Sequence, residues 1–449
     1  MRTASPCDGL VVTESITLAP GVHVAPRGIT VAADDVVIDG QGALLLSPDG
    51  AGAGITLTGR ANVTIRNVRL AGYRHGIHAR ACRYLVLSRN RVSGTAELPP
   101  NTVFLDIWRP ADQAYGAGIL LQDVLDSRVE DNDLQHQQNG LLTYGCRRIR
   151  VARNEVSYNS GFGIHLYGTC DSLFEGNRAD YCCRFEPREG GLHHGHMGAD
   201  AAGFVAVYGS SGNTFRQNTA RMGGDGFFLA GLTPAGEKRG CDDNLFEEND
   251  ASLSPNIAFE ATFCRGNVFR RNHADRSNYG FWLGFSWDSV IEGNRMVANR
   301  QAGVAVENGH GCAVRGNTFQ ANGHGVLLWS RRASQFEEAF PDALTSHDWD
   351  IDGNRFTRNG IGVRIAANQD HGIRNLPETA GAPPGPRPHG HRILRNDIQD
   401  NRIGVELVGV DDTRIEANIL NRNVEANLRQ DDAHQTVARN NLGSAGGYL

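Results

Sequence analysis

Carboxylate side chains recur beside short segments that share the pattern Gly-apolar-x-apolar. Hydrolysis of a glycosidic bond needs one carboxyl group to protonate the leaving oxygen and a second to activate water or attack carbon. Aligning the segments places Asp225, Glu260 and Glu307 on one outward surface, with His165 further back along the same surface. We therefore predict these four residues as catalytic candidates of a carbohydrate-cleaving enzyme.

The same outward positions carry aromatic side chains, which can stack on sugar rings. One expected column contains His165, Ala206, Phe228, Glu260, Trp282, Ala305 and Leu327, and a second, two residues on, contains Tyr167, Tyr208, Ala230, Thr262, Gly284, Glu307 and Trp329. Residues two apart on a strand share a face, so the columns predict one track for an extended saccharide. Its predicted sugar-binding residues are Tyr167, Tyr208, Trp282 and Trp329. The alternative is an ordinary sheet face whose aromatic residues are covered by loops.

A histidine-rich loop supplies further candidates. Arg184, His194, His196 and Asp200 are expected to reach the substrate from this loop. Its side chains are also ligand types for a borderline metal, but their spacing matches no standard zinc site. We therefore expect no cofactor, with a divalent metal at the His193–His196 loop, beside Cys182 and Cys183, as the alternative.

Two other functions stay open. A lyase or epimerase acting on a uronic-acid polymer needs a base at C5 and a cation for the uronate. His165, the two tyrosines, Arg184 and the histidine loop are candidates for those roles. A non-catalytic glycan-binding or assembly protein would use the same groove. An oligo- or polysaccharide is the expected partner for each of these functions, except where the assembly protein handles a metal. The sequence does not indicate the oligomeric state.

These residues must be positioned by a repeat, which is visible in the asparagines. Successive repeat asparagines are 22 or 23 residues apart wherever no insertion intervenes. They are Asn132, Asn154, Asn177, Asn249, Asn272, Asn294, Asn317, Asn354, Asn396, Asn418 and Asn440. A second series follows five residues later, at Asn159, Asn299, Asn322, Asn359, Asn401 and Asn423. Short alternating segments predict strands that stack in parallel about 4.8 Å apart. The asparagines are then a structural ladder of amide hydrogen bonds rather than ligands.

The predicted fold is all-β: one right-handed parallel β-helix domain over residues 1–449, with about 13 coils of 22–23 residues. Residues 1–50 are expected to form an N-terminal cap and the first coils. Insertions, which a solenoid accepts at coil corners, are expected near 91–115, 180–202, 231–243, 330–350 and 369–391. Cys82, Cys146 and Cys264 each lie eight residues before a repeat asparagine, which predicts reduced structural thiols.

The run Asp34-Asp35-Val36-Val37-Ile38-Asp39-Gly40, with the repeated Gly-Ile-x-Leu and x-x-Asn-x-Val units, resembles the pectate-lyase-like superfamily. Within it, the short repeats look most like those shared by NosD-like copper-assembly proteins and mannuronan epimerase-like proteins. The resemblance spans nearly the whole chain and implies the β-helix fold. It implies several functions, because the superfamily includes lyases, hydrolases, epimerases and non-enzymatic members. The Asp-Pro-His-Asp motif of the epimerases does not occur in this sequence.

Composition excludes some partners. The net charge of −6 gives no basic stripe for nucleic acid. No run of 18 apolar residues occurs, so we expect no membrane span. The first residues contain no apolar signal-peptide core, from which we expect a cytoplasmic location.

Overall fold

The structure is a computed structural model that describes residues 1–99, 105–187, 193–196, 201–332, 334–336, 338–367 and 386–443, without the side chains of 185–187, 193–196 and 334. It is a right-handed parallel β-helix, as predicted. The chain divides into two compact units, Met1–Phe228 (unit 1) and Leu229–Leu449 (unit 2), which we describe in turn. Strand β24 (Phe227–Ala230) crosses this boundary.

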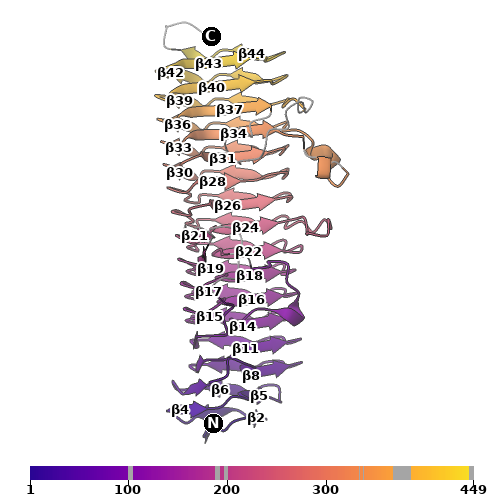
Figure 1. Cartoon of the computed structure of the whole chain (residues 1–449), viewed down its shortest axis with the longest axis vertical. Helices are drawn as coiled ribbons and strands as arrows, with labels where there is room; N and C mark the ends of the chain where they lie inside the picture. The colour runs from indigo at the N-terminus through magenta and orange to yellow at the C-terminus, as the bar shows by residue number, and fades with distance from the viewer. Residues whose placement is uncertain are drawn as a thin grey trace. The chain divides into compact units, whose positions relative to one another are not determined.

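Each coil of unit 1 contributes short parallel strands to lengthwise sheets (Figure 1). Sheet A contains β1 (Arg2–Ala4), β3 (Ile16–Leu18), β6 (Val37–Asp39), β9 (Thr64–Arg66), β12 (Val86–Ser88), β15 (Arg128–Glu130), β17 (Arg150–Ala152), β19 (Leu173–Glu175) and β23 (Thr214–Arg216). Sheet B contains β2 (Leu10–Val12), β5 (Ile29–Val31), β8 (Ala53–Thr58), β11 (His75–Arg80), β14 (Ala117–Gln122), β16 (Leu141–Tyr144), β18 (Ile164–Tyr167) and β22 (Phe204–Val207). A shorter sheet C contains β4 (Val22–Val24), β7 (Leu44–Leu46), β10 (Arg69–Ala71) and β13 (Arg91–Ser93).

Unit 2 repeats this arrangement. Its sheet A strands are β25 (Leu245–Glu247), β27 (Val268–Arg270), β29 (Val290–Glu292), β32 (Ala313–Arg315), β35 (Asp350–Asp352), β38 (Arg392–Leu394), β41 (Arg414–Glu416) and β44 (Val437–Arg439). Its sheet B strands are β26 (Ile257–Thr262), β28 (Tyr279–Trp282), β31 (Ala302–Glu307), β34 (His324–Ser330), β37 (Ile361–Ala367), β40 (Ile403–Val408) and β43 (Ala426–Asp431). Its sheet C strands are β30 (Arg295–Val297), β33 (Thr318–Gln320), β36 (Arg355–Thr357), β39 (Asp397–Gln399), β42 (Ile419–Asn421) and β45 (Leu442–Gly443).

The core forms because alternate residues of each strand point inward. In unit 1, Phe204 and Phe227 stack with ring centroids 4.6 Å apart, and in unit 2 Phe319 stacks on Phe356 at the same distance. Glycine at the second position of a sheet B strand keeps this packing close: at Gly325 of β34 a Cβ atom would lie 2.4 Å from the Gly362 carbonyl oxygen. The recurring glycine of the sequence pattern is therefore required by the approach of one coil to the next.

The asparagine ladder is confirmed. In unit 2, Asn272 Nδ2 donates to Asn294 Oδ1 at 3.0 Å, and Asn294 Nδ2 donates to Asn317 Oδ1 at 3.1 Å. The second series also forms a ladder, as Asn299 bonds to Asn322. One predicted position is wrong: the last bond goes to Asn441, since Asn440 lies in the preceding turn with a positive φ of 55°.

One feature differs from the prediction. Sheet B has 16 strands among the described residues, one for each coil, rather than about 13. Residues 1–50 contribute β1 to β7 to the same sheets. Within the described residues, the ranges predicted as insertions include the 3-10 helices η1 (Ala111–Gln113), η2 (Ser334–Phe336) and η3 (Pro341–Ala343), and the hairpin of β20 (Arg184–Pro187) and β21 (His193–His196). The N-terminal cap and the insertion bounds stay predictions. The interpretation as one domain stays a prediction.

Candidate functional site

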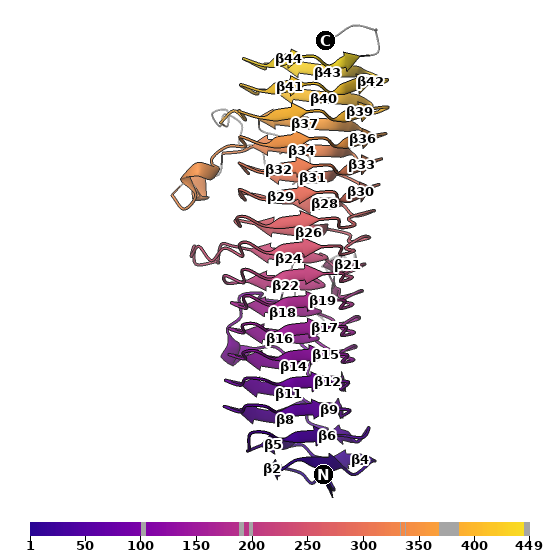
Figure 2. The same ribbon diagram turned by 180° about the vertical axis from the view of Figure 1, so that it is seen from behind.

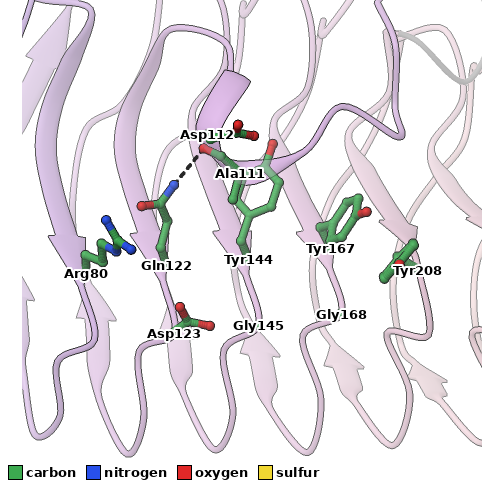
Figure 3. A pocket seen from close by; sticks show the side chains of 10 residues that line it. All are labelled: Arg80, Ala111, Asp112, Gln122, Asp123, Tyr144, Gly145, Tyr167, Gly168 and Tyr208. Atoms are coloured by element: carbon green, nitrogen blue, oxygen red, sulfur yellow. Dashed lines mark hydrogen bonds between the residues drawn. The ribbon is translucent and has the colours of Figure 1, made fainter.

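Unit 1 contains a groove along the outer face of sheet B, with a volume of about 550 Å³. Such a volume is in the usual range of ligand sites. We call it the tyrosine groove. Its lining residues are Arg80, Ala111, Asp112, Gln122, Asp123, Tyr144, Gly145, Tyr167, Gly168 and Tyr208. Figure 3 shows that these side chains come from successive strands, so the groove crosses the strands along the helix axis.

Strand register places the main lining side chains in one file. Arg80 pairs with Gln122, Gln122 with Tyr144, and Tyr144 with Tyr167. The ring centroids of Tyr144 and Tyr167 are 5.3 Å apart, and those of Tyr167 and Tyr208 are 4.4 Å apart. Tyr167 and Tyr208 are half-buried and stack on each other, so they offer mainly ring edges and phenol groups to a ligand. Tyr144 is tilted against Tyr167 and is only 4% exposed, so it lines the groove with a small part of its side chain. The file is therefore suited to a chain of hydroxyl groups.

Tyr208 joins this file from a turn and not from a strand. The predicted columns place Tyr208 level with Tyr167 and Ala206 level with His165, but the register pairs Tyr167 with Val207 and His165 with Val205. This part of the prediction is wrong by one residue. Tyr208 follows the end of β22 with a positive φ of 56°, and this turn brings its ring onto Tyr167.

Residues 105–116, which we call the strap, form one side of the groove. Both views place η1 of the strap beside β14 and β16 (Figures 1 and 2). Two side chains from the sheet donate hydrogen bonds to strap carbonyls: Gln122 Nε2 to Ala111 O at 2.7 Å and Arg74 Nη2 to Ala114 O at 2.7 Å. The amide nitrogen of Gln122 is thereby used, and its oxygen contacts Nε2 of His78 at 3.0 Å. These contacts hold Asp112 beside the groove.

His165 belongs to this support and not to the open groove. It is 2% exposed, and its Nε2 lies 2.9 Å from the carbonyl oxygen of Ile107 in the strap. Its ring stacks on Phe162 at 4.9 Å. Burial lowers the pKa of His165 to about 4, and the bond to Ile107 only partly offsets this effect. A neutral ring with a protonated Nε2 fits these contacts, so the structure assigns His165 an anchoring contact.

A second hollow of about 480 Å³ adjoins the groove and shares Arg80, Ala111, Asp112 and Gln122 with it. It continues over β11 and β8, where Thr56, His75 and His78 contribute to its lining. Burial lowers the pKa of His75 to about 3, so this histidine is neutral near pH 7. A long ligand could therefore extend from the tyrosines across several more coils.

Some lining residues were missed in the sequence, although a signal was present. Tyr-Gly recurs in three consecutive coils, at paired positions in Tyr144-Gly145 and Tyr167-Gly168 and one residue further on in Tyr208-Gly209. The columns predicted from the sequence begin at His165 and Tyr167. They therefore leave out Tyr144 and the two residues of earlier coils in the same file, Gln122 and Arg80. Asp112 and Asp123 carry no such signal, since one lies in an insertion and the other in a turn.

The other predicted residues of unit 1 lie elsewhere. Arg184 is 5% exposed, and its Nη2 donates to Pro99 O at 2.9 Å. Asp225 is 1% exposed, so it does not lie on an open face among the described residues. The backbone of β21 pairs His196 with Arg184 and His194 with Glu186. The histidine side chains and Asp200 lie outside what the structure describes.

In unit 2, the predicted columns are confirmed by the register but their surface is covered. Glu260 pairs with Trp282, which pairs with Ala305, and Glu307 pairs with Trp329. Glu260 is half-buried. The tryptophans are 5% and 0% exposed and belong to one apolar cluster. They therefore match the covered-face alternative better than an open sugar track.

Glu307 has a structural contact. It is 1% exposed, and Arg331 Nε donates to its Oε1 at 2.7 Å. A buried carboxylate needs such a partner because removing the charge from water is costly. Asp225 lies in unit 1, whereas Glu260 and Glu307 lie in unit 2, and their meeting at one site stays a prediction.

The described residues contain no group of three or more His, Cys, Asp or Glu side chains that could hold a metal ion. The proposed alternative at His193–His196 cannot be assessed from this, because those side chains are outside the described set. No described helix has the length and apolar character required to cross a membrane.

Comparison with known proteins identifies the family. A model described as the right-handed β-helix region matches residues 111–236 and 205–340, which together are more than half of the chain. No curated protein matches the chain.

The chain is also similar, at low identity, to several solved structures. The mannuronan C-5 epimerase AlgE6 A-module of Azotobacter vinelandii is 13% identical, with 96% of this chain and 90% of that chain covered and a TM-score of 0.37. The surface protein and adhesin PfbA of Streptococcus pneumoniae is 13% identical, with 70% and 86% covered and a TM-score of 0.42. The catalytic domain of a GH87 alpha-1,3-glucanase is 10% identical, with 98% and 69% covered and a TM-score of 0.37. The family model, which matches more than half of the chain, leads to one conclusion: the chain belongs to the right-handed β-helix family.

Proposed function

We propose that this protein is a carbohydrate-active protein that binds an extended oligo- or polysaccharide in the tyrosine groove. The observation that carries the proposal is the file of Arg80, Gln122, Tyr144 and Tyr167 in consecutive strands, continued by Tyr208. Equivalent polar groups repeat along the axis at about the strand spacing of 4.8 Å. A polymer with regularly repeated hydroxyl groups is the ligand class that such a file fits.

Hydrolysis of the bound saccharide is the reaction that we propose for this site. Asp112 and Asp123 both line the groove, and Figure 3 shows them on either side of the row formed by Gln122 and the tyrosines. Glycosidases need two carboxyl groups that flank the bond to be cleaved. This pair replaces Asp225, Glu260 and Glu307 as the first candidates, since Asp225 and Glu307 are each only 1% exposed.

Lyase or epimerase chemistry is supported less well. A tyrosine base needs an accessible phenol that ionises readily, but burial raises the pKa of Tyr144 well above its usual value. The histidine proposed for this chemistry, His165, is covered by the strap. A binding protein without catalysis remains the second candidate, because the file of tyrosines needs no carboxylate to hold a sugar.

A glycan array followed by product analysis tests these proposals. We expect the wild-type protein to retain a subset of oligosaccharides and to release new reducing ends from them. Asp112→Asn and Asp123→Asn should each abolish the release of reducing ends and leave retention on the array intact. Glu260→Gln is the control and should cleave normally.

The outcomes separate the functions. New absorbance near 235 nm, roughly where an unsaturated uronate absorbs, would indicate elimination and contradict hydrolysis. Retention without products would show a binding protein. If no glycan is retained, the groove does not recognise carbohydrate and the proposal is wrong.

A further inference from the structure

Two cysteines of unit 2 occupy equivalent positions in neighbouring coils. Leu245 pairs with Val268 in the register of β25 and β27, an offset of 23 residues that also relates Cys241 to Cys264. Hydrogen bonds on both sides hold this alignment: Asp242 Oδ1 accepts from Arg265 N at 2.8 Å, and Cys241 O accepts from Asn267 Nδ2 at 3.0 Å.

The two thiols occupy the same place in adjacent coils and are buried. Both cysteines are 0% exposed, Cys241 Sγ donates to Ala230 O at 3.6 Å, and Cys264 Sγ donates to Thr262 O at 3.2 Å. Equivalent Cα atoms of adjacent parallel strands are about 4.8 Å apart, inside the range of about 4.4–6.8 Å found in disulfides. A bond between them would therefore need only side-chain rotation.

We propose that Cys241 and Cys264 form a disulfide between adjacent coils when the chain meets a small-molecule disulfide oxidant such as oxidised glutathione. One cysteine thiolate first attacks oxidised glutathione, which forms a mixed disulfide and releases one reduced glutathione. The second thiolate then displaces the other glutathione. One S–S bond joins the two cysteines, two reduced glutathione molecules are released, and each cysteine proton ends on a glutathione thiol.

Burial determines when this reaction occurs. The attacking species is the thiolate, and burial raises the pKa of the Cys264 thiol well above its usual value. The folded protein should therefore react slowly, whereas a chain that folds in the presence of oxidant closes the bond as the coils meet. The cross-link would close one coil and fix the base of the 231–243 insertion. Lys238 of that insertion lies over the Phe340 ring, 5.1 Å from its centroid.

The test uses the full chain. Reduced protein is unfolded in guanidinium chloride and refolded in a mixture of reduced and oxidised glutathione, and non-reducing digests are analysed by mass spectrometry. We expect a peptide pair joined through Cys241 and Cys264 in most molecules. Cys241→Ser and Cys264→Ser should lack it, and Cys312→Ser should retain it, since Cys312 is equally buried but outside the pair.

A second measurement needs no refolding. Folded wild-type protein is kept with oxidised glutathione, and its denaturant midpoint is measured before and after the two thiols are lost. We expect slow loss of two thiols and a midpoint at higher denaturant concentration, which reducing agent reverses after unfolding. Absence of the Cys241–Cys264 peptide in both experiments, or preferential pairing of Cys241 with another cysteine, would overturn the proposal.

Discussion

Single residues of unit 1 show how similar side chains acquire different roles. Tyr167 and His165 are two apart on the same strand, and both point to the outer face of sheet B. Tyr167 is half-buried in the groove, whereas His165 is covered by the strap. The sequence pattern predicts the shared face but not the cover, because residues 105–116 reach His165 from a distant part of the chain.

His165 should make the stability of the protein depend on pH. Its pKa is about 4 in the folded protein and about 6.5 when unfolded, so folding favours the neutral ring. Above about pH 6.5 the ring is neutral in both states and does not change the free energy of unfolding. As the pH falls toward 4, the unfolded state takes up a proton and the free energy of unfolding decreases by up to roughly 3 kcal/mol. We expect the unfolding free energy of His165→Gln to fall less between these pH values than that of the wild type, as measured by denaturant titrations. Equal pH dependence in both proteins would contradict this account.

At the scale of elements, the asparagine ladder holds successive coils together. Asn294 accepts bonds from the backbone and side chain of Asn272 and donates to Asn317 and to the Phe269 carbonyl. Asn294→Ala leaves buried polar groups without these partners, so we expect a loss of about 2–4 kcal/mol in unfolding free energy. Gln320→Ala, at a half-exposed position of β33, is the control and should change it by less than about 0.5 kcal/mol. A loss at Asn294 no larger than the control's would show that the ladder contributes little.

The strap is the element that a sequence repeat predicts least well. The repeat predicts an insertion near 91–115, but its path depends on bonds from Gln122 and Arg74 to strap carbonyls. Replacing both side chains by leucine should loosen the strap around Ala111 and Ala114, because the side-chain donors to these two carbonyls are removed, whereas the bond of His165 to Ile107 is left. We expect faster hydrogen exchange of amides in 105–116 and weaker saccharide binding. Arg83→Leu, an exposed change outside the groove, is the control. Unchanged exchange in the double variant would mean that other contacts hold the strap.

For the whole chain, the sequence predicted the fold because the fold is repetitive. Period, strand direction and asparagine ladder all depend on local residues, and the same signal occurs in coil after coil. The position of the functional site was harder to predict from the sequence. A shift of one residue at Tyr208 moves that side chain out of its predicted column. The repeat also does not predict that Glu307 is buried, because its partner Arg331 comes from an insertion.

Calorimetric titration with a length series of a saccharide identified on the array tests the central claim most directly. The groove and the adjoining hollow cross several strands, so affinity should rise with oligosaccharide length until the ligand spans them. The triple variant Tyr144→Phe, Tyr167→Phe, Tyr208→Phe loses three phenol groups and should bind at least about tenfold more weakly, on the basis of about 1 kcal/mol for each hydrogen bond. Tyr158→Phe, an exposed tyrosine outside the groove, should bind like the wild type. Equal affinity of the triple variant and the wild type would contradict saccharide binding in the tyrosine groove.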